Sequence, residues 1–150
     1  MKTQDFTLTF TVDRSPDEVF DAINDVRGWW SGEFEGDAAR LGAEFTYRYA
    51  DVHRSRQRVA ELVRGEKIVW QVLDARLAFV KDTDEWTGTS IVFDLAREGR
   101  GTTVRFTHVG LSARNECYDT CSNAWTALLT GNLRRLISSG QHQPDVLAAG

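Results

Sequence analysis

Residues 101–139 read GTTVRFTHVGLSARNECYDTCSNAWTALLTGNLRRLISS and combine a strand pattern with a long helix pattern. In the first part, apolar and polar positions alternate, which is typical of a half-buried strand. Three residues share its buried face: Val104, Phe106 and His108. From about Asn115 to Ser138 there is no proline, apolar residues recur at helical spacing, and Gly140 follows as a stop signal. The sequence therefore predicts a last strand followed by one long C-terminal helix.

The N-terminal part predicts a strand and two short helices. Alternation over Phe6–Val12 indicates the strand, and Ser15 with Glu18 three residues later forms a capping-box signature for the first helix. A second short helix is expected to include the tandem tryptophans Trp29 and Trp30. A glycine-punctuated stretch, residues 31–42, then returns the chain to the sheet.

The middle of the chain predicts a meander of strands at 44–49, 58–63, 68–72 and 91–95, with a possible short strand at 77–80. Helices do not alternate with these strands, so the sheet is expected to be antiparallel, with six or seven strands in an α+β fold. The length fits one domain over residues 1–150, with a core at about 6–139 and a frayed tail at 141–150.

The composition argues against several functional classes. The 18 Lys and Arg residues against 22 Asp and Glu give a net charge of −4, which does not favour a nucleic-acid partner. Apolar runs are too short for membrane insertion, and the N-terminus does not resemble a signal peptide, which suggests a cytoplasmic protein. Phosphate loops, nucleophile elbows and zinc-protease helices are absent from the sequence.

Cys117 and Cys121 are expected to be free thiols. They lie four residues apart in the helix pattern, where a disulfide would require backbone bending. The three histidines show no spacing that would complete a metal site with them, so neither a metal nor a cofactor is predicted.

Four segments carry a resemblance to a known family. They are SPDEVFDAI (15–23), the pair Trp29 and Trp30, VAELVRGEKIVW (59–70), and GTTVRFTHVGL (101–111) ahead of the tryptophan-containing helix. Together they resemble the Bet v 1-like, START-related superfamily called SRPBCC, in the branch similar to the C-terminal domain of the activator of heat-shock protein 90 ATPase. The resemblance implies a helix-grip fold, in which a curved antiparallel sheet wraps around the long C-terminal helix and leaves a cavity.

Aromatic side chains are predicted to wall that cavity, because apolar pockets bind ligands through such surfaces. The predicted ligand-binding residues are Trp29, Trp30, Phe45, Tyr47, Tyr49, Trp70, Trp86, Phe93, Phe106, His108, Cys121 and Trp125. The alternative is that these rings fill the core. Trp86 lies in the polar stretch 81–89, which is either a flap over the cavity mouth or a hairpin tip.

Glu61 and His108 are the weak catalytic candidates. Glu61 is expected on the buried face of its strand with Val59 and Val63, within reach of His108, where the two could do acid–base work. A hydrogen-bonded core histidine is the alternative for His108. The leading hypothesis is non-catalytic binding or transport of a small apolar ligand. The other two hypotheses are a cyclase- or aromatase-like enzyme and an interaction module with a chaperone as partner.

Overall fold

A seven-stranded antiparallel sheet with the order β1-β7-β6-β5-β4-β3-β2 forms one layer of the computed structural model. The structure describes residues 4–30 and 32–140. The strands are β1 (Asp5–Val12), β2 (Glu33–Gly36), β3 (Glu44–Tyr49), β4 (His53–Val63), β5 (Lys67–Leu77), β6 (Ser90–Glu98) and β7 (Gly101–Ser112).

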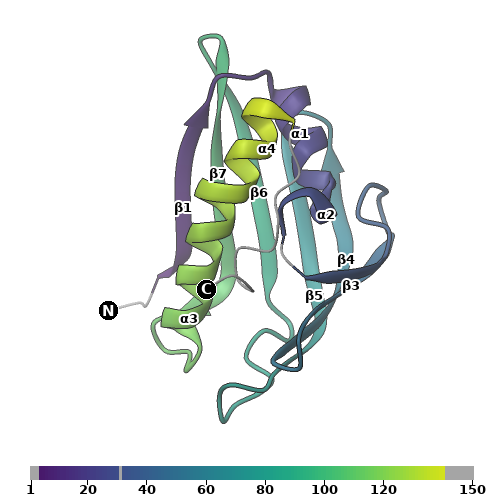
Figure 1. Ribbon diagram of the computed structural model, residues 1–150, viewed down its shortest axis with the longest axis vertical. Coiled ribbons are helices and arrows are strands. Elements are labelled where there is room, and N and C mark those ends of the chain that lie inside the picture. Colours follow the sequence, from purple (N-terminus) through teal and green to yellow (C-terminus); the bar gives the residue numbers. More distant parts are fainter. Residues whose placement is uncertain (1–3, 31, 141–150) are drawn as a thin grey trace.

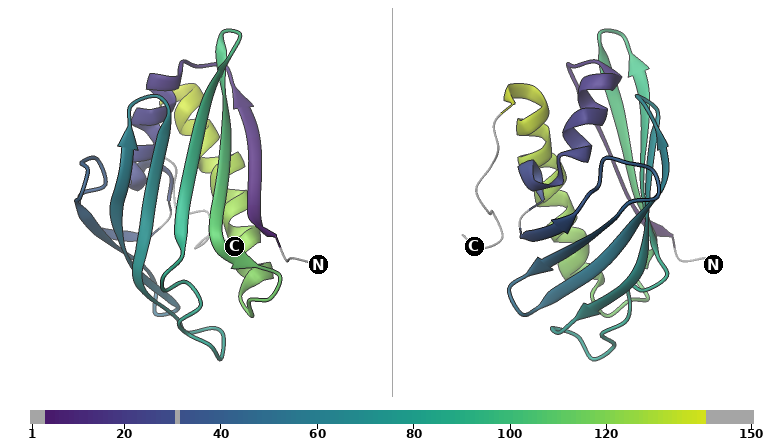
Figure 2. Two further views of the ribbon diagram at one scale, coloured as in Figure 1. Left: turned by 180° about the vertical axis from the view of Figure 1, so that it is seen from behind. Right: turned by 90° about the vertical axis from the view of Figure 1, so that its right-hand side faces the viewer.

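The helices lie together on one side of this sheet. Two short helices, α1 (Pro16–Asn24) and α2 (Val26–Trp29), follow β1. The C-terminal helix consists of α3 (Tyr118–Ala127), a π-helical segment η1 (Leu128–Leu133) and α4 (Arg134–Ser139), which continue into one another. Figure 1 shows this long helix lying across the sheet, and Figure 2 shows the sheet curving around it. The fold is therefore the expected helix-grip α+β arrangement.

Local signals placed several element boundaries correctly. The Ser15 side chain accepts a hydrogen bond from the Glu18 amide at 3.2 Å, and the Glu18 carboxylate accepts one from the Ser15 amide at 3.3 Å. These two bonds satisfy amides at the start of α1 that would otherwise lack partners. Gly140 adopts a left-handed conformation, with φ 73°, and ends the long helix.

Several strand predictions need correction. The stretch 31–42 contains a strand, β2, that was not predicted. Strands β4 and β5 extend well beyond the predicted 58–63 and 68–72, because polar residues such as Ser55 and Gln57 are buried and break the expected pattern. The short strand at 77–80 is wrong, since Leu77 ends β5 and the chain then turns. The expected frayed tail, 141–150, lies outside the described residues.

A β-bulge in β4 reverses the expected orientation of Glu61. Val59 pairs with Trp70, but Glu61 pairs with Val69, so Ala60 is an extra residue on its strand. An extra residue shifts the inward–outward alternation by one position. Val59 is consequently buried, whereas Glu61 and Val63 are exposed.

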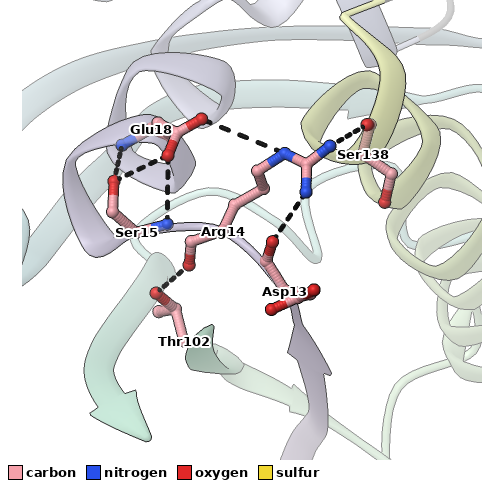
Figure 3. A network of polar contacts seen from close by, with 6 residues as sticks. All are labelled: Asp13, Arg14, Ser15, Glu18, Thr102 and Ser138. Carbon is pink, nitrogen blue, oxygen red and sulfur yellow. Dashed lines mark hydrogen bonds and ion pairs between the residues drawn. The ribbon is translucent and has the colours of Figure 1, made fainter. Parts of the chain in front are cut away.

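Arg14 joins the β1–α1 connection to the far end of the long helix (Figure 3). Its guanidinium donates to the Ser138 carbonyl at 2.7 Å and to the Asp13 carbonyl at 2.7 Å. The Arg14 carbonyl in turn accepts from the Thr102 hydroxyl at 2.8 Å. A cation at the carboxyl end of a helix is favourable, because helix carbonyls without partners gather there. This network holds the helix against the sheet.

Candidate ligand cavity

A cavity of about 480 Å³ lies between the concave face of the sheet and the long helix. It falls within the usual size range of small-molecule sites. It is lined by the residue after α2, by β3, the β3–β4 turn and β4, by the loop after β5, and by one face of the long helix. The lining residues are Trp30, Tyr47, Tyr49, Val52, His53, Phe79, Trp86, Thr120, Cys121, Ala124, Trp125 and Leu128.

Stacked rings form two parts of the cavity wall. Trp30 stacks on Tyr47 with ring centroids 4.3 Å apart, and Trp86 stacks on Trp125 at 5.7 Å with an interplanar angle of 9°. Trp30 and Trp125 join the two parts, with centroids 5.1 Å apart. Aromatic walls of this kind offer a large rigid surface to a flat apolar molecule.

The mouth of the cavity carries exposed apolar side chains. Val52 and Phe79 line the cavity and are 40% and 39% exposed, respectively, whereas Trp30 and Trp125 are buried. Among the residues that the structure describes, no Asp, Glu, Lys or Arg lines the cavity. The cavity is therefore apolar from mouth to wall, with hydroxyl, thiol, imidazole and indole groups as its polar atoms.

His108 lies behind this wall and holds it together. The Trp125 indole Nε1 donates to His108 Nδ1 at 3.1 Å, and His108 Nε2 lies 2.8 Å from the Thr89 hydroxyl, which donates to the Trp86 carbonyl at 2.6 Å. An indole N–H can only donate, so Nδ1 is the acceptor and the proton lies on Nε2. These hydrogen bonds connect the long helix, β7 and the loop between β5 and β6, residues 78–89, which is called the Trp86 loop below.

The environment of His108 removes it from acid–base chemistry. Burial, with a smaller effect from the nearby His53, lowers the pKa of His108 from 6.5 to about 3. Both ring nitrogens have partners in the core, and the side chain does not line the cavity. Glu61 is exposed because of the β-bulge. The predicted Glu61–His108 pair is therefore wrong, and the alternative of a hydrogen-bonded core histidine describes His108.

His53 is a cavity residue that the sequence analysis did not identify. Its Nε2 lies 3.3 Å from the Ser55 hydroxyl, and its ring meets Tyr47 and Trp86 edge to face at 4.9 Å and 4.5 Å. Burial lowers the pKa of His53 from 6.5 to about 3, so the ring is neutral at pH 7. The alternation of His53, Ser55, Gln57 and Val59 along β4 is the signal that could have placed it on the inner face.

Two carboxylates fasten the Trp86 loop to the start of the long helix. The Glu85 carboxylate accepts from the amides of Glu116 and Cys117 at 2.7 Å and 2.9 Å. The Glu116 carboxylate accepts from the amides of Lys81 and Asp82, both at 3.1 Å. These backbone hydrogen bonds lower the pKa of Glu116. Trp86 is 3% exposed, so it is part of the wall and not an exposed hairpin tip.

The two cysteines are free and buried, and Cys121 lines the cavity. The hydrogen bond to Cys121, burial and the proximity of Glu85 raise the pKa of the Cys117 thiol. Among the described residues, no three His, Cys, Asp or Glu side chains converge as a metal site.

The structure divides the predicted ligand-binding residues into two groups. Trp30, Tyr47, Tyr49, Trp86, Cys121 and Trp125 line the cavity. The others pack in the core behind its wall and do not line it, namely Trp29, Phe45, Trp70, Phe93, Phe106 and His108. Trp29 instead braces α2, since its Nε1 donates to the Ile23 carbonyl and its own carbonyl accepts from Asn132, each at 3.0 Å.

Further lining residues were missed, and helical spacing could have found some of them. Ala124 and Leu128 follow Cys121 at intervals of three and seven residues and share its helix face. Val52, Phe79 and Thr120 lie near turns or helix ends, where periodicity gives no signal.

Fold and cavity together define a helix-grip protein with an internal apolar site. Residues 13–138 match the family model of the Activator of Hsp90 ATPase homolog 1-like proteins, and the chain belongs to this family. No curated protein sequence matches the chain closely enough to count as a relative. No helix in the described part of the chain is both long and apolar enough to cross a membrane.

Solved structures show the same fold at low sequence identity. The Aha1 dimer from Colwellia psychrerythraea is 21% identical with a TM-score of 0.73, covering 91% of this chain and 98% of that one. CalU16 from Micromonospora echinospora is 18% identical with a TM-score of 0.64, covering 89% and 76%. DynU16, from the dynemicin biosynthetic locus, is 16% identical with a TM-score of 0.66, covering 91% and 48%.

Proposed function

We propose that this protein binds a small apolar, aromatic molecule in the cavity between the sheet and the long helix. The main support for this proposal is the wall of stacked rings, Trp30 on Tyr47 and Trp86 on Trp125, around a space of about 480 Å³. Rings held in this way present apolar surface without the entropic cost of ordering flexible side chains on binding. The described lining residues offer no paired acid and base, which favours binding over catalysis.

Family membership supports the same proposal. The chain has the helix-grip fold of this family, and its cavity lies between the sheet and the long helix. Fold alone does not establish function, and the aromatic, apolar wall of the cavity is the feature that favours a ligand of this kind.

A cavity-filling variant tests the proposal. Ala124 lines the cavity from the long helix, and Ala127, one turn further along, is exposed and does not line it. Ala124→Trp would place an indole in the ligand space, whereas Ala127→Trp would place it in solvent. Phenylnaphthylamine, an uncharged dye that fluoresces in apolar surroundings, serves as the probe.

We expect saturable binding of the dye to the unmodified protein and to Ala127→Trp, and binding at least about tenfold weaker to Ala124→Trp, because the inserted ring occupies the site. Circular dichroism and thermal unfolding would establish that both variants fold. Equal binding to both variants, or no saturable binding to the unmodified protein, would overturn the proposal.

A further inference from the structure

We infer that the outer face of the sheet binds the phosphate group of a small molecule between Arg54 of β4 and Arg76 of β5. This site lies behind the wall of the cavity, on the opposite face of the sheet, so it goes beyond the proposed function and does not depend on it. Three features of the described residues support the inference: a row of opposed arginines, two guanidinium groups without partners, and a hollow between the side chains.

Three arginines lie side by side across three neighbouring strands. In the register of the sheet, Arg48 of β3 is directly opposite Arg54, and Arg54 is directly opposite Arg76. All three side chains are exposed. The preceding residues Tyr47 and His53 line the cavity on the inner face, so the arginines occupy the outer face. Like charges at directly opposite positions repel each other, and a bound anion would relieve that repulsion.

The next outer position on β4 shows how this sheet otherwise compensates an arginine. Arg56 is directly opposite Asp74, and its Nε lies 3.0 Å from Asp74 Oδ2. Its guanidinium also lies 3.6 Å from the Glu44 carboxylate. Arg56 is therefore placed between two acids on the neighbouring strands, whereas Arg54 is placed between two arginines.

Two guanidinium groups in the row are available to a ligand. Arg48 donates to the Glu33 carboxylate at 3.1 Å, which compensates its charge. Arg54 and Arg76 form no hydrogen bond or ion pair through their side chains in the described part of the chain. Two positive charges on adjacent strands consequently lack a counter-charge from the protein.

A hollow of about 170 Å³ at this row gives an anion its space. It is lined by Arg48, Ala50, Asp51, His53, Arg54 and Arg76. Asp51 is the one acid among these described lining residues, so the arginines outnumber it. A phosphate monoester carries about −1.5 to −2 charges at pH 7, which matches two free guanidinium groups better than one carboxylate does. The planar guanidinium also forms paired hydrogen bonds with phosphate oxygens.

The charge of the whole chain indicates a small ligand. The net charge is −4, so a nucleic acid or an anionic membrane would meet many acidic side chains around the row. A small phosphorylated molecule reaches the row without those contacts. The local positive charge therefore favours a small anion over an extended one.

Three small anions test the charge and the chemical class of the ligand. Methyl phosphate is mainly a dianion at pH 7, methyl sulfate has nearly the same shape with one negative charge, and acetyl-Glu-Glu-amide carries two charges on carboxylates. Dissociation constants would be measured at constant ionic strength from nitrogen–proton NMR shifts of the arginine Nε–H groups. We expect methyl phosphate to bind about tenfold more tightly than the other two, with the Arg54 and Arg76 resonances moving most.

Three variants assign the binding to this site. Arg54→Gln should bind methyl phosphate at least about tenfold more weakly, and Asp51→Asn should bind it about twofold more tightly, because a repelling charge is removed. Arg58→Gln is the matched control. Arg58 is exposed on the same face of β4, lies opposite Glu44 and Gln71, and does not line the hollow, so its loss should leave binding unchanged. The gain in Asp51→Asn cannot arise from a loss of folding.

The possible results either support the inference or overturn it. No saturable binding of methyl phosphate, or equal binding of phosphate and sulfate, would overturn it. Equal weakening in Arg54→Gln and Arg58→Gln would show general attraction to positive charge instead of a site. Tighter binding of the peptide than of methyl phosphate would indicate an acidic protein segment and would overturn the assignment to phosphate. Binding of phenylnaphthylamine in the cavity should be the same in Arg54→Gln as in the unmodified protein, so the inference and the proposed function are tested separately.

Discussion

Trp125 of the long helix donates a hydrogen bond to His108 of β7 over 3.1 Å, and this contact joins the helix to the sheet across the core. It fixes the tautomer of the imidazole, because the indole can only donate. The other imidazole nitrogen pairs with Thr89, which in turn holds the Trp86 carbonyl. His108 therefore acts on the cavity through two tryptophans without touching the ligand space.

Acid should destabilise the protein through His108. Its pKa is about 3 in the folded state against 6.5 when unperturbed, so below pH 6.5 the unfolded chain takes up a proton that the folded chain does not. The stability that the neutral His108 imidazole contributes is fully present above pH 6.5 and is lost progressively as the pH falls toward 3. We expect His108 to lower the free energy of unfolding by about 2 kcal/mol between pH 7 and pH 5.

Urea unfolding of the unmodified protein and of His108→Gln at both pH values checks this expectation. The Gln amide can accept from Trp125 and donate to Thr89, but it does not titrate. His53 is present in both proteins and affects both equally. The variant should lose less stability between pH 7 and pH 5, and equal losses would show that His108 does not cause the acid sensitivity.

Removal of the Glu85 carboxylate should loosen the Trp86 loop. In Glu85→Ala, the amides of Glu116 and Cys117 lose their acceptor at the start of the long helix. Loss of such a cap costs about 1 kcal/mol, and hydrogen exchange should accelerate at the amides of residues 81–87. Both effects are measurable by urea unfolding and by exchange mass spectrometry.

Glu66→Ala provides the control for the Glu85 variant. Glu66 is exposed, and no side-chain hydrogen bond or ion pair of its carboxylate occurs among the described residues. The control should leave both stability and exchange nearly unchanged. Exchange that is equally fast in the two variants, or unchanged in Glu85→Ala, would show that the carboxylate does not hold the loop.

Replacement by alanine should change the stability in opposite directions at two glycines that both have room for a Cβ atom. A Cβ at Gly131, in the π-helical segment, or at Gly42 would meet no atom within 4 Å. Gly42 has φ +82°, which strains an L-residue, whereas Gly131 does not lie in that region. Thermal unfolding should show Gly131→Ala stabilised by up to about 1 kcal/mol and Gly42→Ala destabilised by about 1–2 kcal/mol. Destabilisation of both would show that the π-helical segment itself requires glycine.

Local patterns determined much of the fold from the sequence. The alternation in β1 and β7, the Ser15–Glu18 capping box and the stop at Gly140 each depend on neighbouring residues, so the sequence alone placed them. The long helix was predicted from 115 and begins at Tyr118, a difference expected at a helix end. The rings that line the cavity were partly identified, since aromatic residues on inward faces are candidates for either core or wall.

The tertiary structure decided which of these candidates face a ligand. The β-bulge at Ala60 turned Glu61 outward, because the face of the strand that a residue occupies depends on how the strand pairs with β5. His108 found its partners on the long helix and the Trp86 loop, and His53 joined the wall through the inner face of β4. The sequence thus determined the elements and their inward faces. The cavity and its wall of stacked rings arise from contacts between residues far apart in the chain, which local periodicity does not encode.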